Sequence, residues 1–195
     1  HILYQLLLFS SIDEDYLKDL TLTSTKIRIT FKMLFLYDTG IYLYTLLIRI
    51  ASLKNKKAAA WVNGRKGLIP LIESSLDKNK NYTWFHFASL GEFEQGRPVL
   101  ERLKSDNPEL PVVITFFSPS GYEIRKNYAL ADHVFYLPTD TSTNAREFIR
   151  ILKPERAIFT KYEYWYHYFD ELHQHNIPLY IISGIFRKEQ VFFKW

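Results

Sequence analysis

Glu92 is the residue best placed to do chemistry, because it follows a strand-like run at a small-residue turn. Residues 84–94 read WFHFASLGEFE, which predicts a buried strand, a turn and then a helix that carries Glu92 on its first turn. Ligands of open α/β sheets bind just outside the carboxyl ends of the strands, where such turns lie. Glu92 is therefore either a general base toward a hydroxyl group or an acid that complements the helix dipole. Spacing alone favours the dipole role.

Three loops offer groups that could bind a ligand near Glu92. In the first loop, Gly91 lets the backbone approach a ligand closely. Residues 118–121 read SPSG, and the hydroxyl groups of Ser118 and Ser120 at a helix start can bind an anion or a sugar hydroxyl. Alternatively, the same four residues only cap and begin a helix, with no role in ligand binding.

The third loop, residues 161–165, reads KYEYW and combines a cation, an acid and aromatic rings. Together with the aromatic side chains, Lys161 and Glu163 could bind a sugar or an anionic ligand. The alternative is a solvated ion pair beside packed aromatic residues, and the sequence leaves both open.

The elements that would position these loops alternate regularly from residue 82 onward. Strands joined by helices of about ten residues predict a parallel, doubly wound, Rossmann-like α/β sheet. The predicted strands are residues 82–88, 111–117, 133–137, 156–160 and 179–183, and the predicted helices are residues 92–104, 122–130, 141–152 and 165–175.

Composition excludes several kinds of site in this chain. It has no cysteine, which rules out disulfides, thiolate catalysis and cysteine-based zinc sites. Three of its six histidines, at 167, 173 and 175, lie close together but lack the spacing of a metal site, so we expect no metal. No GxGxxG or phosphate-binding P-loop is present. The net charge is +4, and residues 33–80 carry all of the excess, with eight basic and three acidic side chains.

Residues 33–52 predict an apolar helix that contacts a membrane surface. Asp38 and Arg49 are charges that a spanning helix disfavours, whereas a helix lying in the bilayer surface tolerates them. A basic run follows and suits an anionic leaflet. The alternative is a soluble helix packed on its own domain. The predicted membrane contacts are Leu34, Tyr37, Ile41, Tyr44, Ile48, Lys54, Lys56 and Lys57.

These features divide the chain into three predicted parts. Residues 1–32 are an extension of doubtful origin, with Met33 as the start of the protein proper, or else an ordinary N-terminal helix or strand. Residues 33–57 form the membrane-surface anchor and residues 58–195 the Rossmann-like domain. The aromatic run after residue 184 reads as a linker to a second domain that this chain lacks.

The motifs taken in series resemble the Kdo (3-deoxy-D-manno-oct-2-ulosonic acid) transferases. Residues 84–92 followed by Arg97-Pro98 look like the signature [WH]-x-[HA]-A-S-[VL]-G-E…P of that family. Residues 115–121 are similar to its T-x-T-P-T-G, and residues 163–165 to its E-x-W, although the family often has Thr where Lys161 or Tyr162 stands. The same order includes Leu137-Pro138-x-Asp140, Lys153-Pro154, an anchor-like segment at 36–42 and the GRKG of residues 64–67.

The resemblance implies an inverting, metal-free GT-B glycosyltransferase of lipopolysaccharide assembly, monotopic on the cytoplasmic face of the bacterial inner membrane. It would move Kdo from CMP-Kdo to a lipid A precursor, with no cofactor and no nucleic-acid partner. The N-terminal domain of such enzymes takes the acceptor, and the C-terminal domain holds most of the donor. Carried over by position, Glu92 is the general base, and the acceptor cleft is lined by Ser89, Gly91, Ser118, Ser120, Gly121, Lys161 and Glu163.

Because the donor-binding domain is absent, we expect this chain alone to be inactive. The alternative from another functional class is a non-catalytic, membrane-tethered Rossmann-like binding module. The sequence downstream of residue 195 distinguishes the two, because only the enzyme needs a donor domain there.

Overall fold

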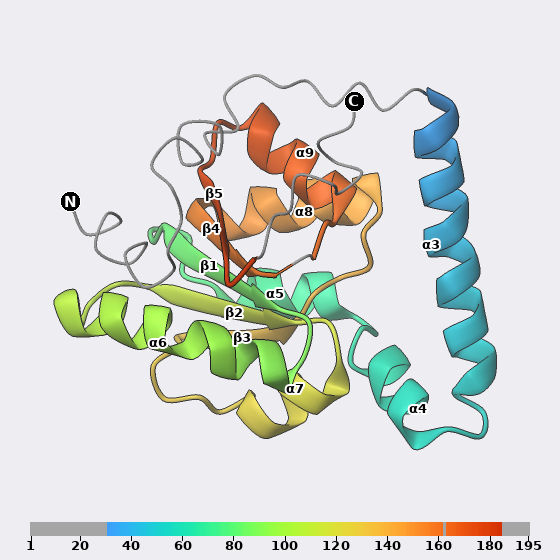
Figure 1. The fold of residues 1–195 in the computed structure, drawn as a ribbon, viewed down its shortest axis with the longest axis horizontal. Coiled ribbons are helices and arrows are strands. Elements are labelled where there is room, and N and C mark those ends of the chain that lie inside the picture. The colour runs from blue at the N-terminus through green and yellow to red at the C-terminus, as the bar shows by residue number, and fades with distance from the viewer. Residues whose placement is uncertain (1–30, 162, 185–195) are drawn as a thin grey trace. The chain divides into compact units, whose positions relative to one another are not determined.

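The computed structural model describes residues 31–161 and 163–184 (Figure 1). The chain divides into two compact units, residues 1–38 and 39–195, and the fold described below belongs to the second. The predicted extension at residues 1–32 lies outside the described residues, apart from the two residues that begin helix α3 (Phe31–Ala51). The predicted linker after residue 184 also lies outside them.

Five parallel strands form one sheet in the order β3-β2-β1-β4-β5, which confirms the predicted Rossmann-like architecture. The chain runs from β1 outward to β3 on one side, and then returns to place β4 on the other side of β1. The strand order therefore reverses between β1 and β4, and ligands of such sheets bind at this reversal. The strands are β1 (Tyr82–Phe87), β2 (Val112–Phe116), β3 (His133–Tyr136), β4 (Pro154–Thr160) and β5 (Leu179–Ile182).

Helices cover both faces of the sheet and enclose two apolar cores (Figure 1). Trp84 and Phe159 point to the face covered by α5, α8 and α9, whereas Phe85 and Phe87 point to the face covered by α6 and α7. Every residue of β1 and β2 is buried, because both faces are covered, and this explains their continuous apolar sequence. The helices are α5 (Leu68–Ser75), α6 (Leu90–Asp106), α7 (Pro119–Arg125), α8 (Ser142–Leu152) and α9 (Tyr166–Gln174).

Helices α7 and α8 begin at side-chain caps that the sequence contains. The Thr141 hydroxyl accepts a hydrogen bond from the Asn144 N–H and begins α8 within one residue of its predicted start. The predicted helix 122–130 is wrong in its bounds, because Ser118 and Pro119 begin α7 three residues earlier and the helix ends at Arg125. Tyr128 beyond it lies in a turn and packs edge-on against Phe93.

The segment between the apolar helix and the sheet forms two short helices that the sequence did not predict. Asn55 caps α4 (Lys56–Asn63) by accepting hydrogen bonds from two backbone N–H groups, so Lys56 and Lys57 belong to its first turn. Gly67 has a φ of 62° and adopts the left-handed conformation that glycine tolerates, which turns the chain into α5. Among the described residues, one helix, Leu34–Ala51, is long and apolar enough to cross a membrane.

Candidate functional site

Glu92 lies at the reversal of strand order, on the first turn of the helix that follows β1. The Ser89 hydroxyl donates a 2.7 Å hydrogen bond to Glu92 Oε2. Ser89 is the residue before α6, but its side chain does not cap the helix and holds the carboxylate instead. The carboxylate is half-buried, and the helix dipole favours its negative charge. Glu92 is thus oriented by Ser89 and remains partly exposed.

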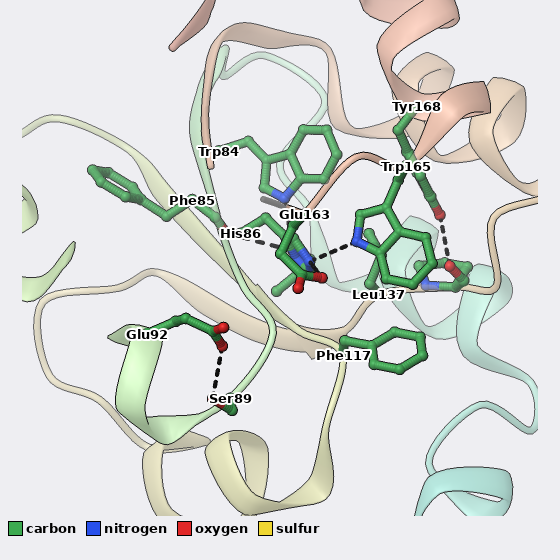
Figure 2. Close-up of polar contacts among 12 residues, drawn as sticks. Trp84, Phe85, His86, Ser89, Glu92, Phe117, Leu137, Glu163, Trp165 and Tyr168 are labelled. Atoms are coloured by element: carbon green, nitrogen blue, oxygen red, sulfur yellow. Dashed lines mark hydrogen bonds and ion pairs between the residues drawn. The ribbon is translucent and has the colours of Figure 1, made fainter. Parts of the chain in front are cut away.

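The three predicted loops meet at the carboxyl ends of the strands. The Ser118 N–H donates to the Ala88 carbonyl at 2.8 Å, so the loop after β2 is fastened to the loop after β1. The ring of Phe117 packs against Trp165 of the loop after β4, with 4.8 Å between ring centroids. Figure 2 shows the carboxyl groups of Glu92 and Glu163 projecting into the region beyond the end of β1. The sequence therefore identified segments that the fold brings together.

Within the second loop, the described contacts favour structural roles. Ser118 Oγ lies 3.3 Å from the Ser120 N–H, whose hydrogen bond it accepts, and 3.0 Å from Ser120 Oγ. Gly121 is buried, and a Cβ there would overlap the ring of Phe116, so close packing accounts for this glycine. Gly91 differs, because it is exposed and a Cβ would meet only Ser89 Oγ at 3.9 Å.

In the third loop, Lys161 has a φ of 61°, a left-handed conformation that is uncommon for a residue other than glycine. Its N–H donates to the Ile182 carbonyl at 2.8 Å, which holds the start of the loop to β5. The Glu163 side chain is 21% exposed, and its Oε2 lies 3.8 Å from Nε2 of the fully buried His86.

His86 belongs to a chain of polar side chains beneath this loop that sequence reasoning missed. Its Nδ1 lies 2.9 Å from Thr115 Oγ1, and its Nε2 accepts a 3.2 Å hydrogen bond from the indole N–H of Trp165 (Figure 2). Burial lowers the pKa of His86, while Glu163 and Glu92 act in the opposite direction. The sequence did contain one signal of this network, a histidine inside an apolar strand, because a buried imidazole needs hydrogen-bond partners.

Arg65 is a second polar residue, partly buried, to which the sequence reasoning gave no role. Its guanidinium donates to the carbonyls of Leu137, Phe117 and Trp61 at 2.9, 2.8 and 3.2 Å, and so ties α4 to the ends of β2 and β3. It also lies 3.9 Å from the centroid of the Trp61 ring. Burial lowers the pKa of Arg65 to about 10, which leaves the side chain charged at neutral pH.

The apolar helix presents two different sides in the second unit. Tyr44, a predicted membrane contact, packs against Trp61 and Phe117, with centroid distances of 6.1 and 6.0 Å. Ile41 and Ile48, on the same stripe, are partly buried. Tyr44 is still 43% exposed, and within residues 39–51 the apolar side chains more exposed than it are Tyr42, Leu43, Leu47 and Ile50 on the neighbouring stripe.

Shape alone does not single out the Glu92 crevice. One hollow on the described surface is lined by Asn81, Lys153 and His175 at the opposite end of the sheet, and it contains none of the candidate residues. Within residues 31–161 and 163–184, no three His, Asp or Glu side chains gather closely enough to hold a metal ion. Glu92 is therefore distinguished by its chemistry and by its place at the end of β1.

Comparison with known proteins gives a family match over most of the described sheet domain. Residues 61–193 match a family model described as 3-deoxy-D-manno-octulosonic-acid transferase. The 3-deoxy-D-manno-octulosonic acid transferases of Haemophilus influenzae and Chlamydia trachomatis are each 34% identical to this chain over 103 residues. The Aquifex aeolicus protein of the same name is 32% identical over 94 residues. The matches cover 52% of this chain in the first two cases and 48% in the third, but only 24% and 26% of the relatives. The chain therefore spans about a quarter of the length of these relatives.

Proposed function

Because this chain belongs to the 3-deoxy-D-manno-octulosonic-acid transferase family, we propose that it is the acceptor half of a GT-B enzyme that moves Kdo from CMP-Kdo to a lipid A precursor. The observation that carries the proposal is the family match over residues 61–193, which includes the whole sheet and all three loops. Since the chain spans about a quarter of its relatives, we propose that a further domain holds the donor and that this chain alone is inactive.

In the proposed reaction, Glu92 takes the proton from the attacking hydroxyl of the acceptor sugar. The sugar oxygen forms a bond to the anomeric carbon of Kdo as the bond from that carbon to the CMP phosphate oxygen breaks. CMP leaves with the electron pair, and attack from the opposite side inverts the anomeric centre. The Ser89 hydrogen bond supports this role, because it holds one carboxylate oxygen and so fixes the orientation of the group.

The acceptor would lie between the loop after β1 and the loop after β4. Glu163 could accept hydrogen bonds from sugar hydroxyls, and Lys161 could neutralise an acidic group of the acceptor. Gly91 is exposed and would allow close approach of the ligand to the backbone. Ser89, Ser118, Ser120 and Gly121 would support this cleft through the contacts they make within it and beneath it.

A transfer assay tests this function. The full-length product of the gene that encodes this chain is mixed with CMP-Kdo and a lipid A precursor, and the lipid is analysed by mass spectrometry. We expect the lipid to gain the mass of Kdo, while the 195-residue chain alone gives no product. If the full-length product leaves the lipid unchanged and no donor domain follows residue 195, the non-catalytic binding module is the correct function.

Membrane contact is proposed to occur on the cytoplasmic face of the bacterial inner membrane, without a full crossing. The supporting features are the exposed apolar stripe of α3 and the basic run that follows it. Thr45 and Ser52 donate their hydroxyl hydrogens to backbone carbonyls of α3, at 2.8 and 2.6 Å. These bonds satisfy both hydroxyl donors within the helix, which lowers the cost of placing it against lipid.

Reversing the charges of Lys54, Lys56 and Lys57 should weaken binding to anionic liposomes at least about 100-fold, because the loss of three basic residues near the surface already removes about 3 kcal/mol. Co-sedimentation with vesicles of anionic and neutral lipid measures this binding. The matched control changes Lys78, Lys126 and Lys153 to Glu, which alters the net charge equally at sites away from α3 and should change binding little. Liposome binding that does not depend on salt concentration, or an equal loss of binding in the control, would count against membrane contact through these lysines.

A further inference from the structure

The hydrogen bonds around His86 determine which of its nitrogens carries the proton. The indole N–H of Trp165 can only donate, so His86 Nε2 must accept and carries no hydrogen. The ring hydrogen then lies on Nδ1 and is donated to Thr115 Oγ1 at 2.9 Å. Thr115 Oγ1 also accepts from the indole N–H of Trp84 at 2.8 Å and donates to the Phe85 carbonyl. All donors and acceptors are consistent with one neutral tautomer.

The surroundings of His86 favour this neutral form. The imidazole is fully buried, packs on Phe159 of β4, and meets Trp84 of its own strand and Thr115 of β2. The charged groups that face it are Glu163, from the loop after β4, and Glu92, from α6. A proton on Nε2 would displace the Trp165 hydrogen bond and draw Glu163 Oε2, now 3.8 Å away, into an ion pair.

Trp165 is the point at which the third loop is anchored over this network. Its ring packs against Phe117 at 4.8 Å, and its backbone N–H donates to the Glu163 carbonyl at 3.1 Å. The orientation of the Trp165 side chain is therefore coupled to the position of Glu163, two residues earlier. The hydrogen bond from the Trp165 indole N–H to His86 connects the Trp165 ring to β1.

We propose that His86 is a positioning residue that, as its neutral Nδ1–H tautomer, holds Trp165 and thereby sets Glu163 in the acceptor cleft beside Glu92. The proposal rests on the proposed function for its effect on the acceptor, but the tautomer and the Trp165 hydrogen bond stand independently of it. Acid weakens acceptor binding through His86, because protonation moves its hydrogen bond from Trp165 to Glu163.

The direction of the pH effect follows from the lowered pKa of His86. In the unfolded chain the ring takes up a proton near the ordinary value of 6.5, whereas in the folded chain it does so at lower pH. The stabilisation that depends on the neutral ring is therefore complete above about pH 6.5 and is lost as the pH falls through the folded-state pKa.

The first test is a long-range ¹H–¹⁵N NMR spectrum of the imidazole nitrogens in this chain at neutral pH. We expect His86 to show a protonated Nδ1 and an unprotonated Nε2. A spectrum with the hydrogen on Nε2, or on both nitrogens, overturns the proposal whatever the enzyme does.

The second test compares two identical substitutions in the full-length gene product. Trp165→Phe removes the indole donor but keeps a ring on Phe117, and we expect the acceptor KM to rise about tenfold, the size of one lost hydrogen bond, while the donor KM is unchanged. Trp61→Phe is the control, because the Trp61 Nε1 is buried without a hydrogen-bond partner. A merely structural role would lower the amount of active enzyme and leave both KM values alone. Equal acceptor KM values in the two variants overturn the proposal.

The third test uses His86→Gln, which can accept a hydrogen bond from Trp165 but cannot take up a proton in this pH range. The wild-type acceptor KM should stay constant from pH 8 to about pH 6.5 and rise as the pH falls further toward the lowered folded-state pKa of His86, and the rise should disappear in this variant. A rise that persists unchanged in His86→Gln overturns the pH part of the proposal. If the wild type transfers no Kdo, the proposed function fails, while the NMR spectrum still decides the tautomer.

Discussion

In the full-length gene product, we expect the replacement of Glu92 by Gln to lower kcat for Kdo transfer about 1,000-fold, within the range for the loss of a general base. Glutamine has nearly the same shape, so Ser89 can still donate to the side-chain oxygen, but the amide cannot take a proton from the acceptor hydroxyl. The KM for the acceptor should change little, because the loss is confined to the transition state. Mass spectrometry of the lipid product, at saturating substrates, measures the rate.

Glu94→Gln is the matched control, because Glu94 lies two residues further along the same helix. Its carboxylate pairs with Arg97 and Arg125 and ties α6 to α7, away from the crevice. We expect this variant to keep near wild-type activity with a small loss of stability, as is typical of exposed ion pairs. Equal activity in the two variants would show that Glu92 is not the base.

Replacing Arg65 by Lys destabilises the domain by about 3 kcal/mol, because hydrogen bonds to a charged group contribute about 1.5–3 kcal/mol each. A single ammonium group cannot reproduce the guanidinium fork, whose Nε donates to Leu137 and whose Nη2 donates to Phe117. At least one of those carbonyls would lose its partner, and the cation over the Trp61 ring would shift. Urea unfolding followed by circular dichroism gives the free energy of unfolding.

The neighbouring residue provides the comparison for Arg65. Lys66 is exposed, so Lys66→Ala should change the free energy of unfolding by less than about 0.5 kcal/mol. A loss in Arg65→Lys no larger than in Lys66→Ala would mean that the guanidinium contacts do not hold α4 to the sheet.

The sheet could be predicted from the sequence because buried parallel strands are continuous apolar runs. Residues 82–88 and 112–116 contain such runs, and proline or glycine residues lie near their ends. Glu92 could be placed at a strand end for the same reason. The reversal of strand order between β1 and β4 makes that strand end a crevice, and it depends on the pairing of segments about 70 residues apart.

Arg65 and His86 could not be assigned roles from the sequence because their partners are distant along the chain. Arg65 donates to carbonyls 52 and 72 residues away, and carbonyls carry no sequence signal. Trp165 and His86 are 79 residues apart. Packing also decides what the stripe of Ile41, Tyr44 and Ile48 contacts: its periodicity follows from the sequence, but the ring contacts of Tyr44 with Trp61 and Phe117 depend on the fold.

The most direct measurement of the central claim, that Glu92 is the general base, is rescue of a Glu92→Ala variant by formate. Alanine leaves room for a small carboxylate beside Ser89, and formate bound there can take the proton that Glu92 would have taken. We predict that the variant's transfer rate rises in proportion to formate concentration, whereas the wild-type rate does not. A Glu92→Ala variant that transfers Kdo at the wild-type rate without formate would contradict the account.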